Sequence, residues 1–268
     1  MSIYYKENPK YLNQCMESLA VQTLPATEII IIKDGKLTDG LENILSIWKE
    51  KLPLKIEGYE KNRGLAHALN YGLQFCSHEL VARMDSDDIS MPDRFEKQTK
   101  YLSEHKNAVV VGATILEFYD GKKIKYSGVR NYPIHIDKKS KYLFTGTPLA
   151  HPTVIIRTEV LRKYRYNVNT SSNEDIDLWF RLVLDGYTIN NLNDMLLKYR
   201  ITDNTFSRRS YVKALGELKI YSNNLMKLCG FSYLFIFPLL RFISRLLPAK
   251  VIKRMYFSKR RQNFFMVT

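Results

Sequence analysis

Several signatures of secreted and metal-binding proteins are missing from this sequence. Its 268 residues contain only three cysteines, Cys15, Cys76 and Cys229, and no two of them have the spacing of a metal site. Their odd number and scatter favour reduced thiols in the cytosol over a disulfide framework. We also expect no signal peptide, because residues 2–5 already have the composition of a first strand.

Glycine-rich phosphate loops are also missing. No G-x-G-x-x-G follows the first expected strand, and no P-loop sequence occurs in the chain. Sugar nucleotidyltransferases would need such a loop near residue 10, where the chain instead has Pro9-Lys10-Tyr11. These absences argue against the common dinucleotide-binding, P-loop and nucleotidyltransferase enzymes.

Acidic residues stop early. The last one is Glu217, and the final 51 residues contain ten Lys and Arg with no Asp or Glu. The formal net charge of +14 therefore divides into +10 for this segment and +4 for the first 217 residues. A basic segment of this kind favours an anionic partner, and both nucleic acid and anionic lipid fit.

The chain also lacks a long apolar run. Residues 231–240 are uncharged and rich in aromatics, but they fall well short of the roughly 20 residues that span a bilayer. Beside Arg241 and Arg245, such a stretch fits a segment lying in the membrane interface. The alternative is a helical hairpin packed on the rest of the protein. We prefer the membrane interpretation because no acids in the segment balance its cations.

The order of the expected elements predicts an α/β fold. In the first 105 residues, short apolar strands alternate with amphipathic helices, which favours a mostly parallel, doubly wound, Rossmann-like sheet. Strands are expected at 2–5, 28–33, 54–58 and 80–84, and helices at 9–23, 41–51, 64–75 and 92–105. Later strands are expected at 108–118, 122–126, 151–157, 187–191 and 196–200, and helices at 174–185 and 210–229.

The densest polar motif follows the strand at 80–84. Asp85-Ser86-Asp87-Asp88 places three carboxylates in four residues at a strand end, where ligands of doubly wound sheets bind. Oxygen ligands of this kind suit Mg²⁺ or Mn²⁺ together with substrate phosphates. The alternative is an exposed acidic turn, in which Asp88 caps the following helix.

Short segments in a characteristic order run through roughly residues 1–210. They are Ser18-Leu19, Gln22-Thr23, Asn62-Arg63-Gly64-Leu65-Ala66 with Asn70 and Gly72, Asp85-Ser86-Asp87-Asp88, Met91-Pro92-Asp93-Arg94, and Glu174-Asp175 with Leu178-Trp179 and Arg181. In order and spacing they resemble the family 2 glycosyltransferases, which have the GT-A fold. The resemblance implies a catalytic domain at 1–209, with a nucleotide-sugar-binding half at 1–105. Residues 106–209 would form an acceptor half with a small antiparallel sheet, and 210–268 a basic, helical, membrane-associating tail.

The resemblance also implies roles for residues of the donor site. Tyr4 and Asp34 would line the nucleoside pocket, with Asp34 meeting the uracil edge, and Arg63 would lie near the nucleotide. Asp85 would lie near the ribose. Asp87 would bind a divalent metal, Mn²⁺ or Mg²⁺, that holds the diphosphate.

On the acceptor side, the resemblance implies that Asp175 is the general base of an inverting transfer. Burial, or the neighbouring Glu174 and Asp177, would raise its pKa to suit this role. His151 would face the diphosphate and is a candidate metal ligand. Arg94 is expected to be a structural ion-pair partner of the acids.

A closing segment over the diphosphate would include Tyr199-Arg200 and Ser207-Arg208. Relatives often have a histidine two residues after that arginine, where this chain has Thr202.

The resemblance extends to bacterial O-antigen, lipopolysaccharide and capsule transferases. It implies transfer from a UDP-sugar, with UDP-galactose as the first candidate, to GlcNAc linked to undecaprenyl diphosphate. The enzyme would sit peripherally on anionic lipid at the cytoplasmic face of the bacterial inner membrane. Two alternatives stay open, namely another donor such as a glucose or GlcNAc nucleotide, and a nucleic-acid-binding protein that uses the tail. The second has no recognition helix or RNA-stacking motif to support it.

Overall fold

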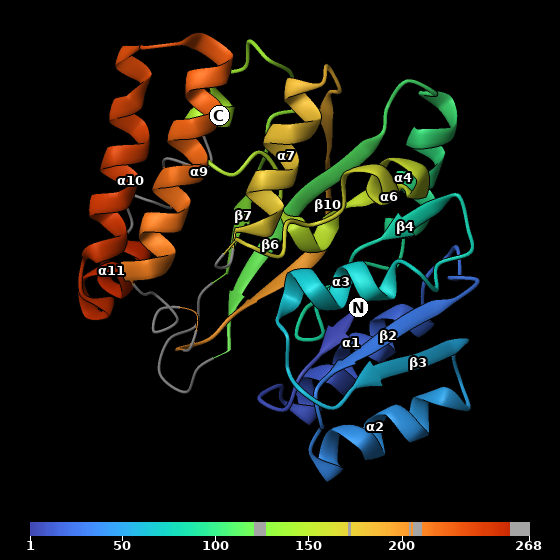
Figure 1. The fold of residues 1–268 in the computed structure, drawn as a ribbon. Coiled ribbons are helices and arrows are strands. Elements are labelled where there is room, and N and C mark those ends of the chain that lie inside the picture. Colours follow the sequence, from blue (N-terminus) through green and yellow to red (C-terminus); the bar gives the residue numbers. More distant parts are fainter. Residues whose placement is uncertain (121–126, 171–172, 204, 206–210, 258–268) are drawn as a thin grey trace.

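The N-terminal part of the protein is a three-stranded parallel sheet between helices (Figure 1). The computed structural model describes residues 1–120, 127–170, 173–203, 205 and 211–257. In the first sheet, β2 (Ile29–Asp34) pairs in parallel with β1 (Ser2–Ile3) and β3 (Leu54–Tyr59). The helices of this part are α1 (Pro9–Ala20), α2 (Asp39–Lys49) and α3 (Leu65–Gly72).

The isoleucine run of β2 explains why both faces of this sheet are covered. Successive side chains of a strand point to opposite faces. Ile29 and Ile31 accordingly belong to the core shared with α1 and α2, whereas Ile30 and Ile32 pack with Ala68 of α3. The parallel, helix-covered arrangement predicted for this part is confirmed for three of its four expected strands, and the fourth, expected at 80–84, lies in the other sheet.

A second, mixed sheet contains the strand that precedes the acids. Its order is β4–β9–β6–β10–β5, with β7 beside β6 and β8 beside β10. The β6–β10 pair is parallel, and the other pairs are antiparallel. The strands are β4 (Leu80–Ala82), β5 (Ile89–Ser90), β6 (Val110–Tyr119), β7 (Ser127–Arg130), β8 (His135–Ile136), β9 (Ile155–Arg157) and β10 (Ile189–Ile201). Through β4, the acids of the first half therefore belong to the sheet of the second half.

Three predicted elements differ from the structure. The strand expected at 151–157 begins as the 3-10 turn η1 (His151–Thr153), because Pro152 has no N–H for strand pairing, and only β9 is extended. The two strands expected at 187–191 and 196–200 are one strand, β10, with irregular register between Leu192 and Leu197. A fourth expected strand, at 122–126, lies outside the described residues, and among the described strands β7 pairs with β6.

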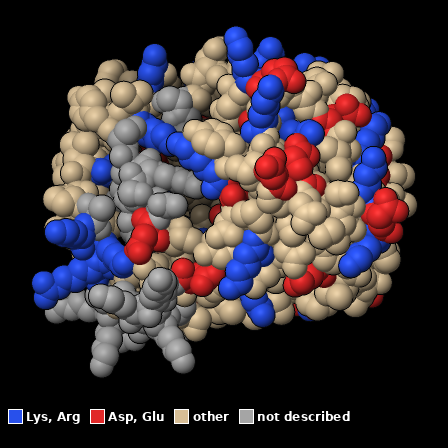
Figure 2. All heavy atoms as spheres, turned by 90° about the horizontal axis from the view of Figure 1, so that it is seen from below, with Lys and Arg blue, Asp and Glu red and all other residues tan. Residues whose placement is uncertain are grey.

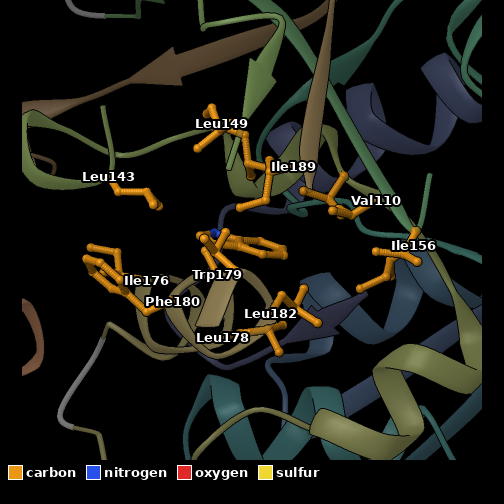
Figure 3. Close-up of a cluster of buried hydrophobic side chains, with 14 of the residues drawn as sticks. Val110, Leu143, Leu149, Ile156, Ile176, Leu178, Trp179, Phe180, Leu182 and Ile189 are labelled. Atoms are coloured by element: carbon orange, nitrogen blue, oxygen red, sulfur yellow. The ribbon is translucent and has the colours of Figure 1, made fainter. Parts of the chain in front are cut away.

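Helix α7 (Glu174–Leu184) is the centre of the main hydrophobic core. Its Trp179 is 1% exposed and packs among side chains from β6, β9 and β10, as Figure 3 shows for Val110, Ile156 and Ile189. The helix ends before Gly186, whose φ of +94° is a left-handed value that favours glycine. The remaining helices of this part are α4 (Arg94–Glu104), α5 (Tyr142–Thr145) and α6 (Thr158–Tyr164).

The C-terminal helices form a layer against α7 (Figure 1). They are α9 (Tyr211–Cys229), the 3-10 turn η2 (Tyr233–Phe235), α10 (Ile236–Leu246) and α11 (Ala249–Tyr256). Tyr221 and Leu225 of α9 are fully buried in the same core as Trp179. Among the described helices, none combines the length and the apolar character needed to cross a membrane.

The assumption that no acid balances the tail cations is wrong for three of them. Glu217 is buried and forms ion pairs with both Arg241 and Arg245, and Lys253 pairs with Asp203 of the preceding segment. The sequence count missed these pairs because both acids lie just before the acid-free segment. Residues 211–257 of the tail thus form helices that pack on the protein and on one another, and the membrane interpretation needs a basis other than unbalanced charge.

Candidate active site

All seven residues predicted to form the site line one cavity. It has a volume of about 1330 Å³ and lies between the first sheet, the acid-bearing turn and the C-terminal helices. Figure 2 shows basic and acidic side chains bordering a hollow on one face of the molecule. The predicted residues that line the cavity are Tyr4, Asp34, Arg63, Asp85, Asp87, His151 and Asp175.

Asp34, at the end of β2, organises the loop before α3. Its Oδ1 accepts a hydrogen bond from the Arg63 N–H (2.7 Å), and its Oδ2 accepts from Asn62 Nδ2 (2.9 Å) and the Gly64 N–H (3.0 Å). Gly64 has a φ of +90°, which the loop needs in order to turn into the helix. The loop in turn holds Arg63 at the cavity, with its guanidinium over the ring of Tyr59. This supporting role of Asp34 was not predicted.

Asp85, Asp87 and Asp88 form a cluster that can hold a cation. Each offers one carboxylate oxygen, and these oxygens lie within 4.8 Å of one another. Asp88 does not cap α4. It is buried, and its Oδ1 accepts from the backbone N–H of Arg200 on β10 (2.8 Å). Its Oδ2 is buried without a hydrogen-bond partner. Burial and the two neighbouring acids raise the pKa of Asp88 well above its usual range.

These observations fit a divalent metal. A buried carboxylate oxygen without a partner is costly, and a hard cation with oxygen ligands would satisfy it while offsetting the repulsion among the three acids.

Arg83 provides positive charge beside these acids. Its side chain is buried and forms an ion pair with Asp85. Arg94, which was expected to pair with the acids, has other partners. It donates to the carbonyl oxygen of Arg83 (2.7 Å) and to Gln98 Oε1 (3.1 Å). The partner predicted for Arg94 was therefore wrong. Arg83 could have been identified from the sequence as the one cation in the otherwise apolar run 80–84.

Arg200 fixes the acid-bearing turn from the opposite direction. Only 4% exposed, it donates from Nε to the carbonyl oxygen of Asp87 (2.7 Å) and from Nη2 to Gln14 Oε1 (2.7 Å). Its Nη1 bonds to Asp120, and its guanidinium lies over two aromatic rings. Arg200 was expected in a segment that closes over the diphosphate. In the structure it is buried and bonds to the backbone and side chains of the acid-bearing turn. Ser207-Arg208 of that segment lie outside the described residues.

His151 lines the cavity, as expected of a residue facing the diphosphate, and its hydrogen-bond partner within the protein is Tyr166. Its Nε2 lies 2.9 Å from the hydroxyl of Tyr166, and its ring packs edge-on against Trp179. Burial, and then the charge of Arg83, lower its pKa well below the usual range, so the imidazole is neutral. In the described part of the chain, the group of potential metal ligands contains the three aspartates and not His151.

Asp175 and Glu174 bring two carboxylates to the cavity at the start of α7. Burial raises the pKa of both groups, and Asp175 raises that of Glu174 further. Asp177 is not among the main causes of either shift, contrary to the expectation. It pairs with Arg181 (2.8 Å), which also donates to the carbonyl oxygen of Tyr164. Of the three acids in this turn, Asp175 and Glu174 are thus the two that a substrate can reach.

The sequence model described as Glycosyl transferase family 2 matches residues 2–165, more than half of the chain. The chain belongs to glycosyltransferase family 2. A relative from Erwinia amylovora, "Amylovoran biosynthesis glycosyltransferase AmsE", is 37% identical over 96% of both chains. An Escherichia coli relative, "UDP-Gal:alpha-D-GlcNAc-diphosphoundecaprenol beta-1,3-galactosyltransferase", is 34% identical over 82% of this chain and 79% of its own length.

Solved structures show the same fold. S. aureus TarS 1-349 in complex with UDP has a TM-score of 0.63 at 20% identity, covering 100% of this chain and 74% of that one. "Mannosyltransferase PcManGT from Pyrobaculum calidifontis in complex with GDP-Man and Mn2+" has a TM-score of 0.62 at 15% identity, covering 99% and 82%. The predicted GT-A fold is therefore confirmed.

The contacts of Arg200 generate a prediction about the acid-bearing turn. Arg200→Lys keeps the charge but loses the planar fork that reaches Asp87 and Gln14. We expect the apparent affinity for Mn²⁺, measured as the rise in melting temperature on adding the ion, to fall about tenfold or more.

Arg157→Lys is the matched control. Arg157 is also mostly buried and donates to the carbonyl oxygens of Ala108 (3.0 Å) and Leu102 (2.9 Å), and its hydrogen bonds do not involve the acid-bearing turn. Both substitutions are expected to lower stability by about 1–3 kcal/mol. If Arg157→Lys weakened Mn²⁺ binding as much as Arg200→Lys, the specific role of Arg200 would be refuted.

Proposed function

We propose that the protein is an inverting hexosyltransferase that moves a sugar from a UDP-sugar to a sugar on a polyprenyl diphosphate. The observation that carries this proposal is that one cavity contains both the aspartate cluster and Asp175, whose pKa burial raises. UDP-galactose is the first candidate donor and diphosphate-linked GlcNAc the first candidate acceptor, as in the name of the Escherichia coli relative. O-antigen or capsule synthesis is the corresponding process.

The donor would occupy the side of the cavity formed by the first sheet. Tyr4 and Asp34 would hold the nucleoside, with Arg63 beside the phosphates. Asp85 and Asp87, joined by Asp88, would hold Mn²⁺ or Mg²⁺. When bound, the cation neutralises charge on the departing diphosphate.

Asp175 is the proposed base. An acid that works as a base near neutral pH benefits from a pKa above the ordinary value of about 3.9 for aspartate, because its basicity rises with pKa. Two effects oppose each other here: the start of α7 favours the ionised form, and burial disfavours it. Burial is the larger effect, since the pKa of Asp175 is raised. The ionised carboxylate would take the proton from the acceptor hydroxyl as that oxygen attacks the donor sugar from the face opposite the leaving diphosphate.

Substitution of Asp175 tests this role. Asp175→Asn should lower kcat about 10²–10⁴-fold and leave UDP binding intact. Because the base works only when ionised, the wild-type rate should fall as pH falls through the raised pKa of Asp175, and the variant should lose this limb of the profile. Asp177→Asn is the control, since Asp177 pairs with Arg181. A greater loss of rate in Asp177→Asn than in Asp175→Asn would show that the base has been misassigned.

A screen of donors and acceptors tests the proposed reaction. Nucleotide sugars, including UDP-galactose, UDP-glucose and UDP-GlcNAc, are offered with short-chain lipid-diphosphate GlcNAc or GalNAc, with Mn²⁺ or with EDTA. We expect transfer from one UDP-sugar that requires the metal and that Asp87→Ala abolishes without loss of folded protein. Full turnover in excess EDTA would rule out the metal role. Absence of transfer from every UDP-sugar would rule out the donor class.

We further propose that the C-terminal helices hold the enzyme on anionic lipid at the cytoplasmic face of the bacterial inner membrane. The basis is an exposed apolar face rather than the pairing cations. On α10, Leu239, Leu240 and Ile243 are each 46–54% exposed, and Phe231 just before the helix is 94% exposed. Exposed apolar side chains at this helical spacing, with basic side chains nearby, fit the membrane interface.

Replacement of this face tests the membrane contact. Leu239→Ser, Leu240→Ser and Ile243→Ser combined should weaken binding to vesicles of anionic lipid about tenfold or more, because each apolar side chain loses its burial in lipid. Co-sedimentation with vesicles at low salt measures the effect.

The matched control replaces Val21, Leu24 and Ile47 with Ser. These side chains are 42–61% exposed and belong to the first half of the chain. This variant should bind vesicles like the wild type. Wild-type protein that fails to bind anionic vesicles at low salt would contradict the membrane proposal.

A further inference from the structure

The C-terminal helices contribute cations to the catalytic cavity. Lys213 of α9 and Arg245 of α10 both line it, together with Ile252 and Met255 of α11. The cavity that contains Asp175 therefore has a wall formed by the helices after residue 210, a part of the chain that the family model does not match. We propose that Arg245 and Lys213 bind the diphosphate of the acceptor. This inference rests on the proposed function, because it assumes a diphosphate-linked acceptor.

A buried carboxylate holds the arginines of this wall in place. Glu217 accepts from Arg245 Nε (2.9 Å) and Nη2 (3.3 Å) and also pairs with Arg241. Arg241 further donates to Thr147 Oγ1 (3.3 Å), another residue that lines the cavity. One carboxylate thus orients two guanidinium groups and leaves one positive charge over. A guanidinium has more N–H donors than this carboxylate takes from Arg245, so Arg245 can also bind a phosphate oxygen.

Charge on this side of the cavity suits a diphosphate ester. Arg130 of β7 lines the same cavity and pairs with Glu117 (3.4 Å), so that pair is neutral. The pairs of Glu217 with Arg241 and Arg245 leave one positive charge in surplus, which matches an acceptor diphosphate in sign.

The position of the wall fits an acceptor better than a donor. The nucleoside side of the cavity is formed by Asp34 and Arg63, on β2 and the loop before α3. Arg245 lines the same cavity as Asp175, the proposed base, and the charge of Glu217, which pairs with Arg245, raises the pKa of Asp175. In a sugar-diphosphate acceptor, one sugar ring separates the attacking hydroxyl from the phosphates, which therefore must lie near the base as well. Ile252 and Met255 would then accompany the start of the lipid chain.

Removal of these cations tests the inference with two acceptors. One is a short-chain alkyl-diphosphate sugar, and the other is an alkyl glycoside of the same sugar, which has no phosphates. Arg245→Gln and Lys213→Gln should each raise KM for the diphosphate acceptor about ten- to a hundredfold. KM for the UDP-sugar and kcat/KM for the alkyl glycoside should stay unchanged. Arg241 still pairs with Glu217 in Arg245→Gln, and Lys213 is exposed, so both variants are expected to fold.

Lys219→Gln is the matched control for charge. Lys219 is exposed on the same helix as Lys213 and does not line the cavity. It should leave all three constants unchanged. An equal loss on both acceptors would show that Arg245 and Lys213 only support the structure. An equal loss in Lys219→Gln would show a general effect of charge, and either result overturns the inference.

Direct binding separates this inference from the proposed function. Calorimetry with a short-chain alkyl diphosphate needs neither donor nor turnover. If no donor gives transfer but the wild type binds this probe more tightly than Arg245→Gln, the proposed reaction fails and the anion site stands. If transfer to the diphosphate acceptor occurs and Arg245→Gln binds the probe like the wild type, the anion site fails and the proposed reaction stands.

Discussion

Repulsion among Asp85, Asp87 and Asp88 is the constraint on which the active site depends. Three carboxylate oxygens within 4.8 Å of one another cannot all stay ionised in a partly dry cavity without compensation. Arg83 supplies positive charge from the residues between β4 and the acids, and Arg200 holds the turn from β10. These two arginines offset part of the repulsion among the carboxylates. The Oδ2 of Asp88 is buried without a hydrogen-bond partner, which leaves the rest of the compensation to a cation.

The same constraint explains how the two sheets are joined. The acid-bearing turn follows β4, whose partner is β9 of the second half, and it bonds to Arg200 at the end of β10. From the other side, Cys15 of α1 donates to the carbonyl oxygen of Asp85 (3.3 Å), and Gln14 of the same helix accepts from Arg200. The metal-binding turn is therefore fixed by elements of both halves, and the cavity between the halves keeps its shape through these contacts.

The sequence predicted the features that depend on neighbouring residues, and it missed the contacts that depend on residues far apart in the chain. The isoleucine run of β2, the acids after β4 and the start and end of α7 follow from local patterns, and the structure has them close to the predicted places. The strand partner of β4, the burial of Arg200 and the pairing of Glu217 depend on contacts between residues 24 to 113 positions apart. No local pattern distinguishes a buried, paired arginine from a solvated one, so the charge count could not show that Arg241 and Arg245 are paired.

Burial links the chemistry of Asp175 to the packing of the whole second half. Burial raises its pKa, and Asp175 is buried at the start of α7, the helix whose Trp179 packs in the main core together with Tyr221 of α9. A carboxylate held in this way costs the fold some stability at neutral pH, since ionisation in a buried position is unfavourable. The C-terminal helices also affect the base directly, because the charge of Glu217 on α9 raises the pKa of Asp175. The basicity proposed for Asp175 therefore depends on the burial of this part of α7 as well as on the Glu174-Asp175 motif.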